Sequence, residues 1–463
     1  MSVATPTAPF DASPPAALES TPKAAWYALF VLTMVTLFAF VDRTIFVLLA
    51  EPIKTRLSIS DFQLGLLQGT GIALFASLAS YPLGWLSDRF DRRVVLGGCV
   101  IVWSLAVVAC ALSQTFEQLF IASAMVGAGE AGLVPVVFSM IPDLFPVKRR
   151  QLANSIFAIA AASAGGLALA ISGQLVAHVD AVRPLLPAAL QAWDGWRLSL
   201  LGAALPAPLM LLLIATVRLR KRTADSTPAA AVAAAQPDEH ASVRLLPFIR
   251  ENFRTVVFFQ LGIATATLGF GSMGAWVSVI LMRVYHRTAE QIGSIVGPLT
   301  LLSTGLAFLL SIYVARRFGE RHGEALPVRA LWLSYLVAAL ANLSLLFIDT
   351  VEPLYVISTL TGMLTGAAGM MYPTAIQNMA PAQLRGRLIS IQSVCSLIFG
   401  AIAAPVVGLV SDGLGDSPRS ILIAAISVSV PALLLSATLL RASESTFART
   451  VAAARRIEEA AAH

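Results

Sequence analysis

The chain has 463 residues, of which 57% are hydrophobic and only 13% are charged, and its mean hydropathy is +0.78. A soluble protein of this length needs about twice that share of charged residues to cover its surface, so a soluble globular fold is excluded. The formal net charge of +6 could indicate a nucleic-acid-binding protein, but most lysines and arginines lie between apolar segments, which is typical of membrane topology.

Residues 1–25 are rich in Pro, Ala, Ser and Thr and lack the basic, apolar and cleavage regions of a signal peptide. We expect a disordered cytoplasmic N-terminal tail there. Twelve apolar segments follow, each close to the ~20 residues that a spanning helix needs. The pattern predicts an all-α polytopic membrane protein with spanning helices at 26–50, 62–86, 94–113, 116–141, 151–176, 197–217, 255–282, 289–314, 330–348, 353–376, 388–411 and 420–440.

The first predicted helix contains an acid and a base side by side, Asp42 and Arg43. At ~1.5 Å per residue this helix crosses a ~30 Å hydrocarbon core, and charges at that depth persist only where they face a protein interior or a wet cavity. The two residues form either a self-neutralising structural pair or a site for a substrate or a proton. A second acid within the membrane, Glu130 in the fourth predicted helix, favours the site.

The loop after the second predicted helix, residues 84–93, reads G-x-x-x-D-R-x-x-R-R. Gly84 permits a neighbouring helix to approach, Asp88 can cap a helix N-terminus, and the arginines can reach acids at helix ends. As a basic turn the string is common, but at this place in a twelve-helix chain it is the loop signature of the major facilitator superfamily. Asp143, at the inner end of the fourth predicted helix, is the expected partner of Arg89 or Arg92. The predicted conformational latch consists of Gly84, Asp88, Arg89, Arg92, Arg93, Asp143 and, at the start of the eleventh helix, Arg385.

The fourth predicted helix carries the sequence GAGEAG at residues 127–132. Small residues permit tight helix contact, and a buried acid among them needs a partner or a proton. Burial disfavours the ionised form of Glu130, whereas the positive charge of Arg43 would favour it, and this opposition suits an acid that couples transport to protons. The alternative is an acid bonded permanently to the backbone or to Arg43.

The distribution of basic residues predicts the orientation of the chain in the membrane. Only seven of the 32 lysines and arginines fall in the loops of one side, namely Lys54, Arg56, Arg183, Arg197, Arg283, Arg287 and Arg419. Because basic loops resist translocation, we expect both termini in the cytoplasm and the protein in the inner (plasma) membrane.

Residues 218–254 are predicted to join the two halves as a cytoplasmic linker. The middle part, 223–242, is mostly Ala with Pro, Asp, Ser and Thr, so it cannot bury enough apolar surface to fold. Residues 243–254 mix large apolar side chains with arginines. That mixture predicts either a short helix on the membrane surface or an extended lead into the seventh spanning helix.

Two sequence blocks recur in equivalent places of the two halves. Gln-Leu-Gly at 63–65 matches Gln-Ile-Gly at 291–293, and residues 146–156 align with 381–391, which pairs Arg150 with Arg385. The repeat predicts duplication of a six-helix unit. We expect two pseudo-symmetric six-helix bundles, at 26–217 and 255–441, and a cytoplasmic C-terminal tail at 442–463.

The second half has no ionisable side chain inside its predicted helices seven to twelve, but it offers small and hydroxyl-bearing residues. Thr265 and Thr267 in the seventh helix and Tyr372 in the tenth are candidates for lining a cavity. A cavity that is charged on one wall and apolar on the other suits an amphiphile. The alternative is that helices of this kind are apolar without any functional reason.

Five sequence features together resemble the spinster-like branch of the major facilitator superfamily, most clearly over residues 26–175: FVDR at 40–43, AEPIK at 50–54, the loop at 84–93, GAGEAG at 127–132 and DLFP at 143–146. The resemblance implies two six-helix bundles around a cavity lined by helices one, four, seven and ten, working by alternating access. It also implies proton-linked export of lysophospholipids or sphingoid phosphates. The acid and base on helix one of that branch correspond to Asp42 and Arg43, and its helix-four acid corresponds to Glu130.

Two positions depart from the pattern of that branch. Ser123 stands where the branch and many proton-coupled relatives have an arginine, and Met125 replaces a glycine. Proton coupling through that arginine is therefore not available to this chain. Of the two acids within the membrane, Asp42 has Arg43 beside it to hold it ionised, so Glu130 is the predicted coupling residue.

The leading hypothesis is a secondary active transporter, working by alternating access and coupled to protons, for an amphiphilic anion such as a lysophospholipid or sphingoid phosphate. Efflux of hydrophobic drugs or transport of a small organic anion would use the same architecture, and a membrane receptor that binds without transporting is the alternative from another class. We find no catalytic set, metal site or cofactor motif, so an enzyme is not expected. The expected partners are the small substrate, protons and the lipid bilayer, without nucleic acid, and we expect a monomer.

Overall fold

The computed structural model describes residues 23–217 and 245–462. Over these residues the chain is almost entirely helical and contains no β-strand. The predicted N-terminal tail up to residue 22 and the middle of the predicted linker lie outside the described residues.

The first bundle contains several spanning helices that are interrupted near their middle. The second span is α3, η1 and α4, the fourth is α6 and α7, and the sixth is α10 and α11. The elements are α1 (Lys23–Leu48), α2 (Ala50–Leu57), α3 (Asp61–Gly65), the π-helix η1 (Leu66–Gly71), α4 (Ile72–Arg89), α5 (Arg92–Leu112), α6 (Phe116–Glu130), α7 (Leu133–Leu144), α8 (Val147–Val182), the short η2 (Arg183–Leu185), α9 (Ala188–Gln191), α10 (Gly195–Ala204) and α11 (Ala207–Thr216).

The second bundle begins after a short helix, α13, which lies within the 243–254 segment, so the helical alternative for that segment is the one the structure shows. Its Phe248 is buried, whereas Leu246 is exposed. The elements are α13 (Leu245–Glu251), α14 (Phe253–Arg283), α15 (Ala289–His322), η3 (Gly323–Ala325), α16 (Leu326–Ser344), η4 (Leu345–Phe347), α17 (Glu352–Gly369), α18 (Tyr372–Met379), α19 (Ala382–Leu414) and α20 (Ser420–Ala462).

The described residues contain 11 continuous helical segments that are long and apolar enough to span a membrane. One of them, Ala289–Phe347, holds both α15 and α16, which are separated by η3, where Gly323 has a φ of +54°. A positive φ breaks an α-helix, and glycine adopts it at low cost. This segment therefore crosses twice, and the prediction of twelve spanning helices in two six-helix bundles is confirmed.

The repeated Gln-containing blocks are helix N-terminal caps. The Ser60 hydroxyl accepts from the Gln63 backbone N–H at 3.2 Å, and the Gln63 side chain accepts from the Ser60 N–H at 3.0 Å. Thr288 and Gln291 exchange the same two hydrogen bonds, both at 3.2 Å. Each pair satisfies two backbone donors that a helix start leaves free. The sequence repeat thus reflects the start of the second helix of each bundle.

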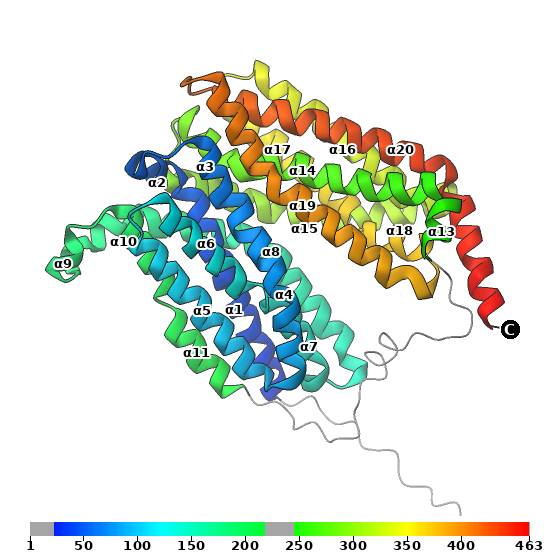
Figure 1. Ribbon diagram of the computed structural model, residues 1–463, viewed down its shortest axis with the longest axis horizontal. Helices are drawn as coiled ribbons and strands as arrows, with labels where there is room; N and C mark the ends of the chain where they lie inside the picture. Colours follow the sequence, from blue (N-terminus) through cyan, green and yellow to red (C-terminus); the bar gives the residue numbers. More distant parts are fainter. Residues whose placement is uncertain (1–22, 218–244, 463) are drawn as a thin grey trace, which may run out of the picture.

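The two bundles touch at one end of the molecule and diverge toward the other (Figure 1). At the touching end, α3 and η1 pack on α19, and α8 packs on α15. Glycines bring the backbones close: a Cβ on Gly65 would lie 2.5 Å from the Ala404 carbonyl oxygen, and one on Gly293 would lie 2.8 Å from the Gly173 Cα. Association in lipid depends on such close backbone approach, because apolar side chains gain nothing by leaving lipid tails.

The last helix extends well beyond the span predicted for it. Residues 442–462, predicted as a tail, continue α20 instead. The helix contacts η3 and α18 at this end of the second bundle. Phe447 and Val451 are buried there. Glu444 pairs with Arg329, and Glu458 pairs with Arg385 at 2.9 Å. Hydropathy misses this extension because an amphipathic helix at a membrane surface does not differ in composition from a loop.

Candidate functional site

Asp42 and Arg43 lie on α1 (Lys23–Leu48) and point in different directions, because consecutive helical residues are separated by about 100°. Asp42 is buried, with 3% of its surface exposed, whereas Arg43 is exposed. The Asp42 carboxylate interacts with Glu130 and with the Trp103 indole, so its charge is turned into the bundle. The two residues therefore do not act as one self-contained pair.

Arg43 and Glu130 line the same cavity, of about 170 Å³, between α1, α4 and the junction of α6 with α7. Its lining residues are Ala39, Phe40, Arg43, Ile72, Ala73, Ala76, Glu130, Ala131 and Leu133. Asp42 lies behind this wall, close enough to interact electrostatically with Glu130. The structure thus brings together all three residues that the sequence singles out, two on the cavity surface and one beneath it.

Glu130 is the last residue of α6 (Phe116–Glu130), and the fourth spanning helix is interrupted directly after it. The glycines around it have close neighbours: a Cβ on Gly129 would lie 2.7 Å from the Trp103 backbone nitrogen, and one on Gly132 would lie 2.8 Å from the Cys99 sulfur. These glycines hold α5 against the helix that carries the acid, so small residues are needed here for packing. The position of the acid is set by this three-helix contact.

Two carboxylate oxygens at this site, Asp42 Oδ1 and Glu130 Oε1, are buried and have no hydrogen-bond partner among the described residues. Buried polar atoms in proteins are nearly always paired, so an exception needs a reason. A buried acid without a partner is stabilised by a bound proton or by a ligand that donates to it. Among the described residues Glu130 forms no hydrogen bond or ion pair with the backbone or with Arg43, so this conformation gives no support to the alternative of an acid bonded permanently to either.

Gln68 is a further polar residue of this region that sequence reasoning missed. It lies in the π-helix η1 (Leu66–Gly71), one turn before Ile72 of the cavity wall, and both atoms of its side-chain amide are buried without a partner. π-Helical turns within α-helices are frequent at functional sites. The only sequence signal was a lone amide between glycines in an apolar segment, which is too weak to predict a site.

The basic loop of the predicted latch forms contacts within the first bundle. Arg92 pairs with Asp143, one of the two partners expected for this acid, and also donates to the Ser139 carbonyl oxygen at 2.7 Å. Arg89 instead stacks on Trp85, its guanidinium 4.2 Å from the ring centroid. The loop thus ties the start of α5 to α7.

Two local expectations for this loop need correction. The N-cap of α5 is Asp91, whose carboxylate accepts from the Arg93 N–H at 2.9 Å, and not Asp88, which lies inside α4 and whose side chain is not among those described. The Arg93 guanidinium beside Asp91 holds the pKa of that carboxyl below its usual value. Gly84 has open space around it, so no helix approaches it in this conformation.

Arg385 opens α19 (Ala382–Leu414) and makes its side-chain bonds within the second bundle. It donates to the carbonyl oxygens five and eight residues before it, both at 3.0 Å, as its repeat partner Arg150 does at 3.1 and 3.0 Å. Its remaining bond goes to Glu458 of α20, at 2.9 Å. In this conformation Arg385 therefore faces α20 rather than the basic loop of the first bundle.

The end where the bundles touch carries a network of charges that sequence reasoning counted only as loop residues. Arg283, at the end of α14, bridges Glu51 of α2 and Asp61 of α3, with Nη1 2.9 Å from Asp61 Oδ2. Lys54 also contacts Asp61, at 2.5 Å. The Asp412 carboxylate of α19 accepts from the Asp61 and Phe62 backbone N–H groups, both at 2.9 Å, and so caps a helix of the other bundle.

Both threonine candidates of the second bundle have their hydroxyl groups bonded within their own helix, and Tyr372 packs against an aromatic ring. The Thr265 hydroxyl donates to carbonyl oxygens of its own helix at 2.8 and 3.0 Å, Thr267 does so at 3.0 Å, and Tyr372 stacks on Phe259 with ring centroids 6.0 Å apart. A separate cavity of about 230 Å³ between α14, α15 and α17 is lined by Val277, Val296, Leu299, Thr300, Ser303, Thr304, Leu354, Tyr355, Ser358, Thr359 and Gly362. The second bundle therefore offers hydroxyl groups where the sequence predicts an apolar wall.

Comparison with known proteins agrees with this architecture. The sequence profile of the Major Facilitator Superfamily matches residues 32–403. An MFS-type efflux pump of Mycolicibacterium smegmatis is 27% identical over 404 residues, which cover 85% of this chain and 86% of the pump. Protein spinster homolog 3 of Mus musculus is 25% identical over 381 residues, which cover 79% of this chain and 71% of that protein.

Among solved structures, a bacterial homolog to the human lysosomal transporter Spinster, in an inward-facing and unoccupied conformation, superposes with a TM-score of 0.73. The match covers 95% of this chain and 99% of that chain at 20% identity, so it speaks for the fold. The profile match over most of the chain settles the family. The protein belongs to the Major Facilitator Superfamily, as a membrane transporter related to the spinster proteins rather than an enzyme.

Proposed function

We propose that the protein couples transport of an amphiphilic anion, such as a lysophospholipid or sphingoid phosphate, to protons, and that Asp42, Arg43 and Glu130 form its substrate and proton site. The observation that carries this proposal is the cavity shared by Arg43 and Glu130, in which a buried carboxylate oxygen lacks a partner. Arg43 supplies the positive charge for an anionic head group, and Glu130 binds the proton.

The coupling follows from the charges of the three residues. With both acids ionised, the site carries one net negative charge, which repels an anion. Protonation of Glu130 removes the negative charge from the cavity that it shares with Arg43, so the guanidinium is available to the head group. Because an uncompensated charge within the membrane is costly, the proton and the anion bind more favourably together than separately. Asp42 keeps the site from being positive when it is empty.

The bundle arrangement supports the assignment of one state of an alternating-access cycle. The charge network of Arg283, Glu51 and Asp61 closes the end that the basic-residue distribution assigns to the outside. At the other end the bundles diverge (Figure 1). We assign this conformation as inward-facing, with both termini in the cytoplasm of a cell whose inner membrane holds the protein as a monomer. In the outward-facing state, the basic loop at 84–93 would meet the Arg385 end of α19.

The decisive experiment measures uptake or release in proteoliposomes with and without an imposed pH gradient, using a lysophospholipid, a sphingoid phosphate, an aromatic carboxylate and a hydrophobic cation. Glu130→Gln mimics the protonated acid, so we expect pH-driven accumulation to fall to the level of downhill exchange while ligand binding remains. Glu117→Gln is the matched control, because Glu117 is exposed in the first turn of the same helix. A Glu130→Gln protein that still concentrates substrate would assign the proton to another group.

An efflux pump for hydrophobic drugs is the second candidate, because such a pump is among the relatives. Arg43→Gln separates the two. An anionic substrate should lose roughly 2 kcal/mol or more of binding, which is about 30-fold. A hydrophobic cation should bind as well or better, since a repelling charge is removed. Weaker binding of anions alone would support the anion transporter, whereas unchanged anion binding would contradict it.

A further inference from the structure

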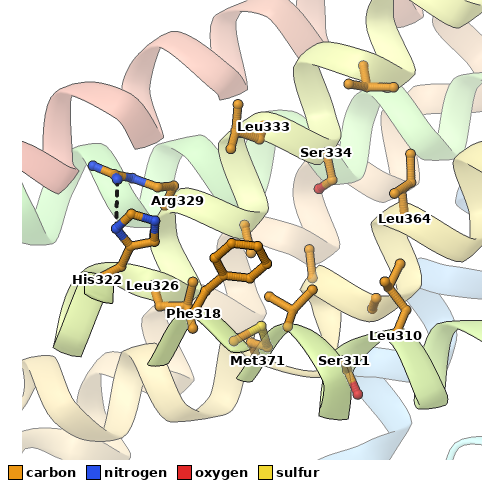
Figure 2. Close-up of a pocket in the computed structure, with 15 residues that line it drawn as sticks. Leu310, Ser311, Phe318, His322, Leu326, Arg329, Leu333, Ser334, Leu364 and Met371 are labelled. Atoms are coloured by element: carbon orange, nitrogen blue, oxygen red, sulfur yellow. Dashed lines mark hydrogen bonds between the residues drawn. The ribbon is translucent and has the colours of Figure 1, made fainter. Parts of the chain in front are cut away.

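A groove on the second bundle lies outside the site described above. It is formed by α15 (Ala289–His322), α16 (Leu326–Ser344) and α17 (Glu352–Gly369), with a volume of about 310 Å³, in the half of these helices far from the Arg283 network. Its walls are apolar, with Val314, Phe318, Leu333, Leu364 and Met371 among the lining side chains (Figure 2). A groove of this size and composition accommodates a hydrocarbon chain.

The groove faces away from the hydroxyl-lined cavity of the same bundle. On α17, Leu364 lines the groove, whereas Tyr355 and Gly362 line the cavity; Met371, which precedes α18, also lines the groove. Nine residues separate Tyr355 from Leu364, which at about 100° per residue places them on opposite faces of the helix. On α16, Leu333 is 43% exposed, so none of the residues that the structure describes covers the groove there. The groove therefore opens to the membrane and not to the hydroxyl-lined cavity.

The end of the groove is polar and donates hydrogen bonds. Arg329 Nη1 lies 3.0 Å from His322 Nδ1, as Figure 2 shows. A guanidinium has no acceptor, so His322 Nδ1 must accept, and the ring proton is on Nε2. The Arg329 side chain is 40% exposed although it also binds Glu444. Two donors thus remain accessible at the mouth of an apolar groove.

The charge around this mouth favours an anion. Arg316, Arg317 and Arg321 of α15 are exposed on the last turns before His322. Of the acids nearby, Glu444 is held by Arg329 and Trp332, and Glu324 by Arg455 and Asn378, while Glu320 is exposed. Basic residues between spanning helices at a membrane surface attract the head groups of anionic lipids. The arrangement therefore has an apolar tail site below a positively charged head-group site.

We propose that this groove holds one acyl chain of a resident anionic phospholipid, whose phosphate accepts hydrogen bonds from His322 Nε2–H and from Arg329. The length of the groove agrees with one leaflet, since the helical rise from Leu310 to His322 is ~18 Å at ~1.5 Å per residue and half of a hydrocarbon core is ~15 Å. The lipid would bridge α15 and α16, which contact each other little in this half. It is a structural lipid and not the transported substrate.

The test uses native mass spectrometry of the purified protein with phosphatidylglycerol or phosphatidylcholine of equal chain length. For the wild type we expect tighter retention of phosphatidylglycerol. Ala330→Phe fills the groove and should reduce retention of both lipids, whereas Ala341→Phe, on α16 but outside the groove, should not. His322→Phe keeps the stacking on Phe318 but removes the donor, so it should weaken phosphatidylglycerol alone by roughly five-fold.

The control for the head-group variant is His178→Phe, at the far end of α8 in the other bundle, which should leave both lipids unchanged. Equal retention of the two lipids by the wild type would reduce the groove to a nonspecific lipid contact and overturn the proposal. So would undiminished lipid retention by a folded Ala330→Phe protein. Displacement of the bound lipid by the transported substrate would identify the groove as part of the transport path and would equally overturn a resident role.

Discussion

Where the bundles meet, α3 and η1 pack on α19 on one side, and α8 packs on α15 on the other. The glycines correspond through the repeat: Gly65 and Gly69 face Ala404 and Ala401, while their counterparts Gly293 and Gly297 face Gly173 and Gly166. The charged residues beside the two contacts, in contrast, do not correspond through the repeat. Asp61, beside the first contact, matches an alanine at 289, and no ion pair among the described residues joins α8 to α15.

The difference assigns separate tasks to the two contacts. Glycine packing depends only on shape, so α8 and α15 can remain together while they pivot. Beside the contact of α3 with α19, Arg283 of α14 adds a partly buried ion network with Glu51 and Asp61, whose stability depends on each partner being present. The two contacts therefore share their glycine packing, but only the one formed by α3 lies beside an ion network that can hold this end shut.

The largest effect is expected when the centre of the ion network is removed. Arg283→Met leaves Glu51 and Asp61 without their shared partner, and loss of one partner of a buried ion network costs about 3–5 kcal/mol. The outer end should open, which double electron–electron resonance would detect as a longer distance between spin labels on Ala192 and Asp416, both exposed. Arg419→Met removes an exposed pair with Asp349 and should leave the distance unchanged. An unaltered distance in Arg283→Met would mean that packing alone closes this end.

Two glycine substitutions with an expected effect of intermediate size compare the α3–α19 contact directly with the α8–α15 contact. Gly65→Ala and Gly293→Ala each place a methyl group 2.5–2.8 Å from the opposite backbone, and overpacking of this kind costs about 1–3 kcal/mol. The same spin labels should report more opening for Gly65→Ala, because a displacement of α3 also moves Asp61 away from Arg283 of α14. Gly305→Ala, which has open space around it, is the control. Equal opening in the Gly65→Ala and Gly293→Ala proteins would contradict the proposal that the two contacts have separate roles.

The smallest effect concerns the cap that α19 provides for α3. Asp412→Asn keeps the side chain but removes the negative charge from the Asp61 and Phe62 backbone N–H groups. A charge at a helix N-terminus is worth about 0.3–1 kcal/mol, so the inward–outward equilibrium should shift up to about five-fold. The label distances measure the shift, and Glu290→Gln, which removes an exposed charge from the first turn of α15, serves as the control. A larger shift would mean that Asp412 has an additional partner in the outward-facing state.

Part of the site could be predicted because its signal is local. Charged residues within an apolar segment are costly wherever the helix faces, so Asp42, Arg43 and Glu130 stand out without a structure. The pairing of Arg92 with Asp143 was also foreseeable, since both lie at helix ends on the same side of the membrane. Which acid caps α5 was not foreseeable: Asp91 does so, and Asp88 lies inside α4. The boundary between α4 and α5 decides which acid precedes a helix, and boundaries are the least certain part of a sequence-based assignment.

The amino-acid sequence by itself determined the number and order of the spanning helices, because hydrophobic length is a local property, and it determined the twofold repeat through two identical capping arrangements. Only the tertiary structure decided that Arg283 meets Glu51 and Asp61, and that Asp412 caps a helix about 350 residues before it. A basic-residue count assigns charges to one side of the membrane but carries no information about which of them meet. That choice depends on the rotation of each helix and on how closely glycines let the bundles approach, and both are set by the packing of the whole molecule.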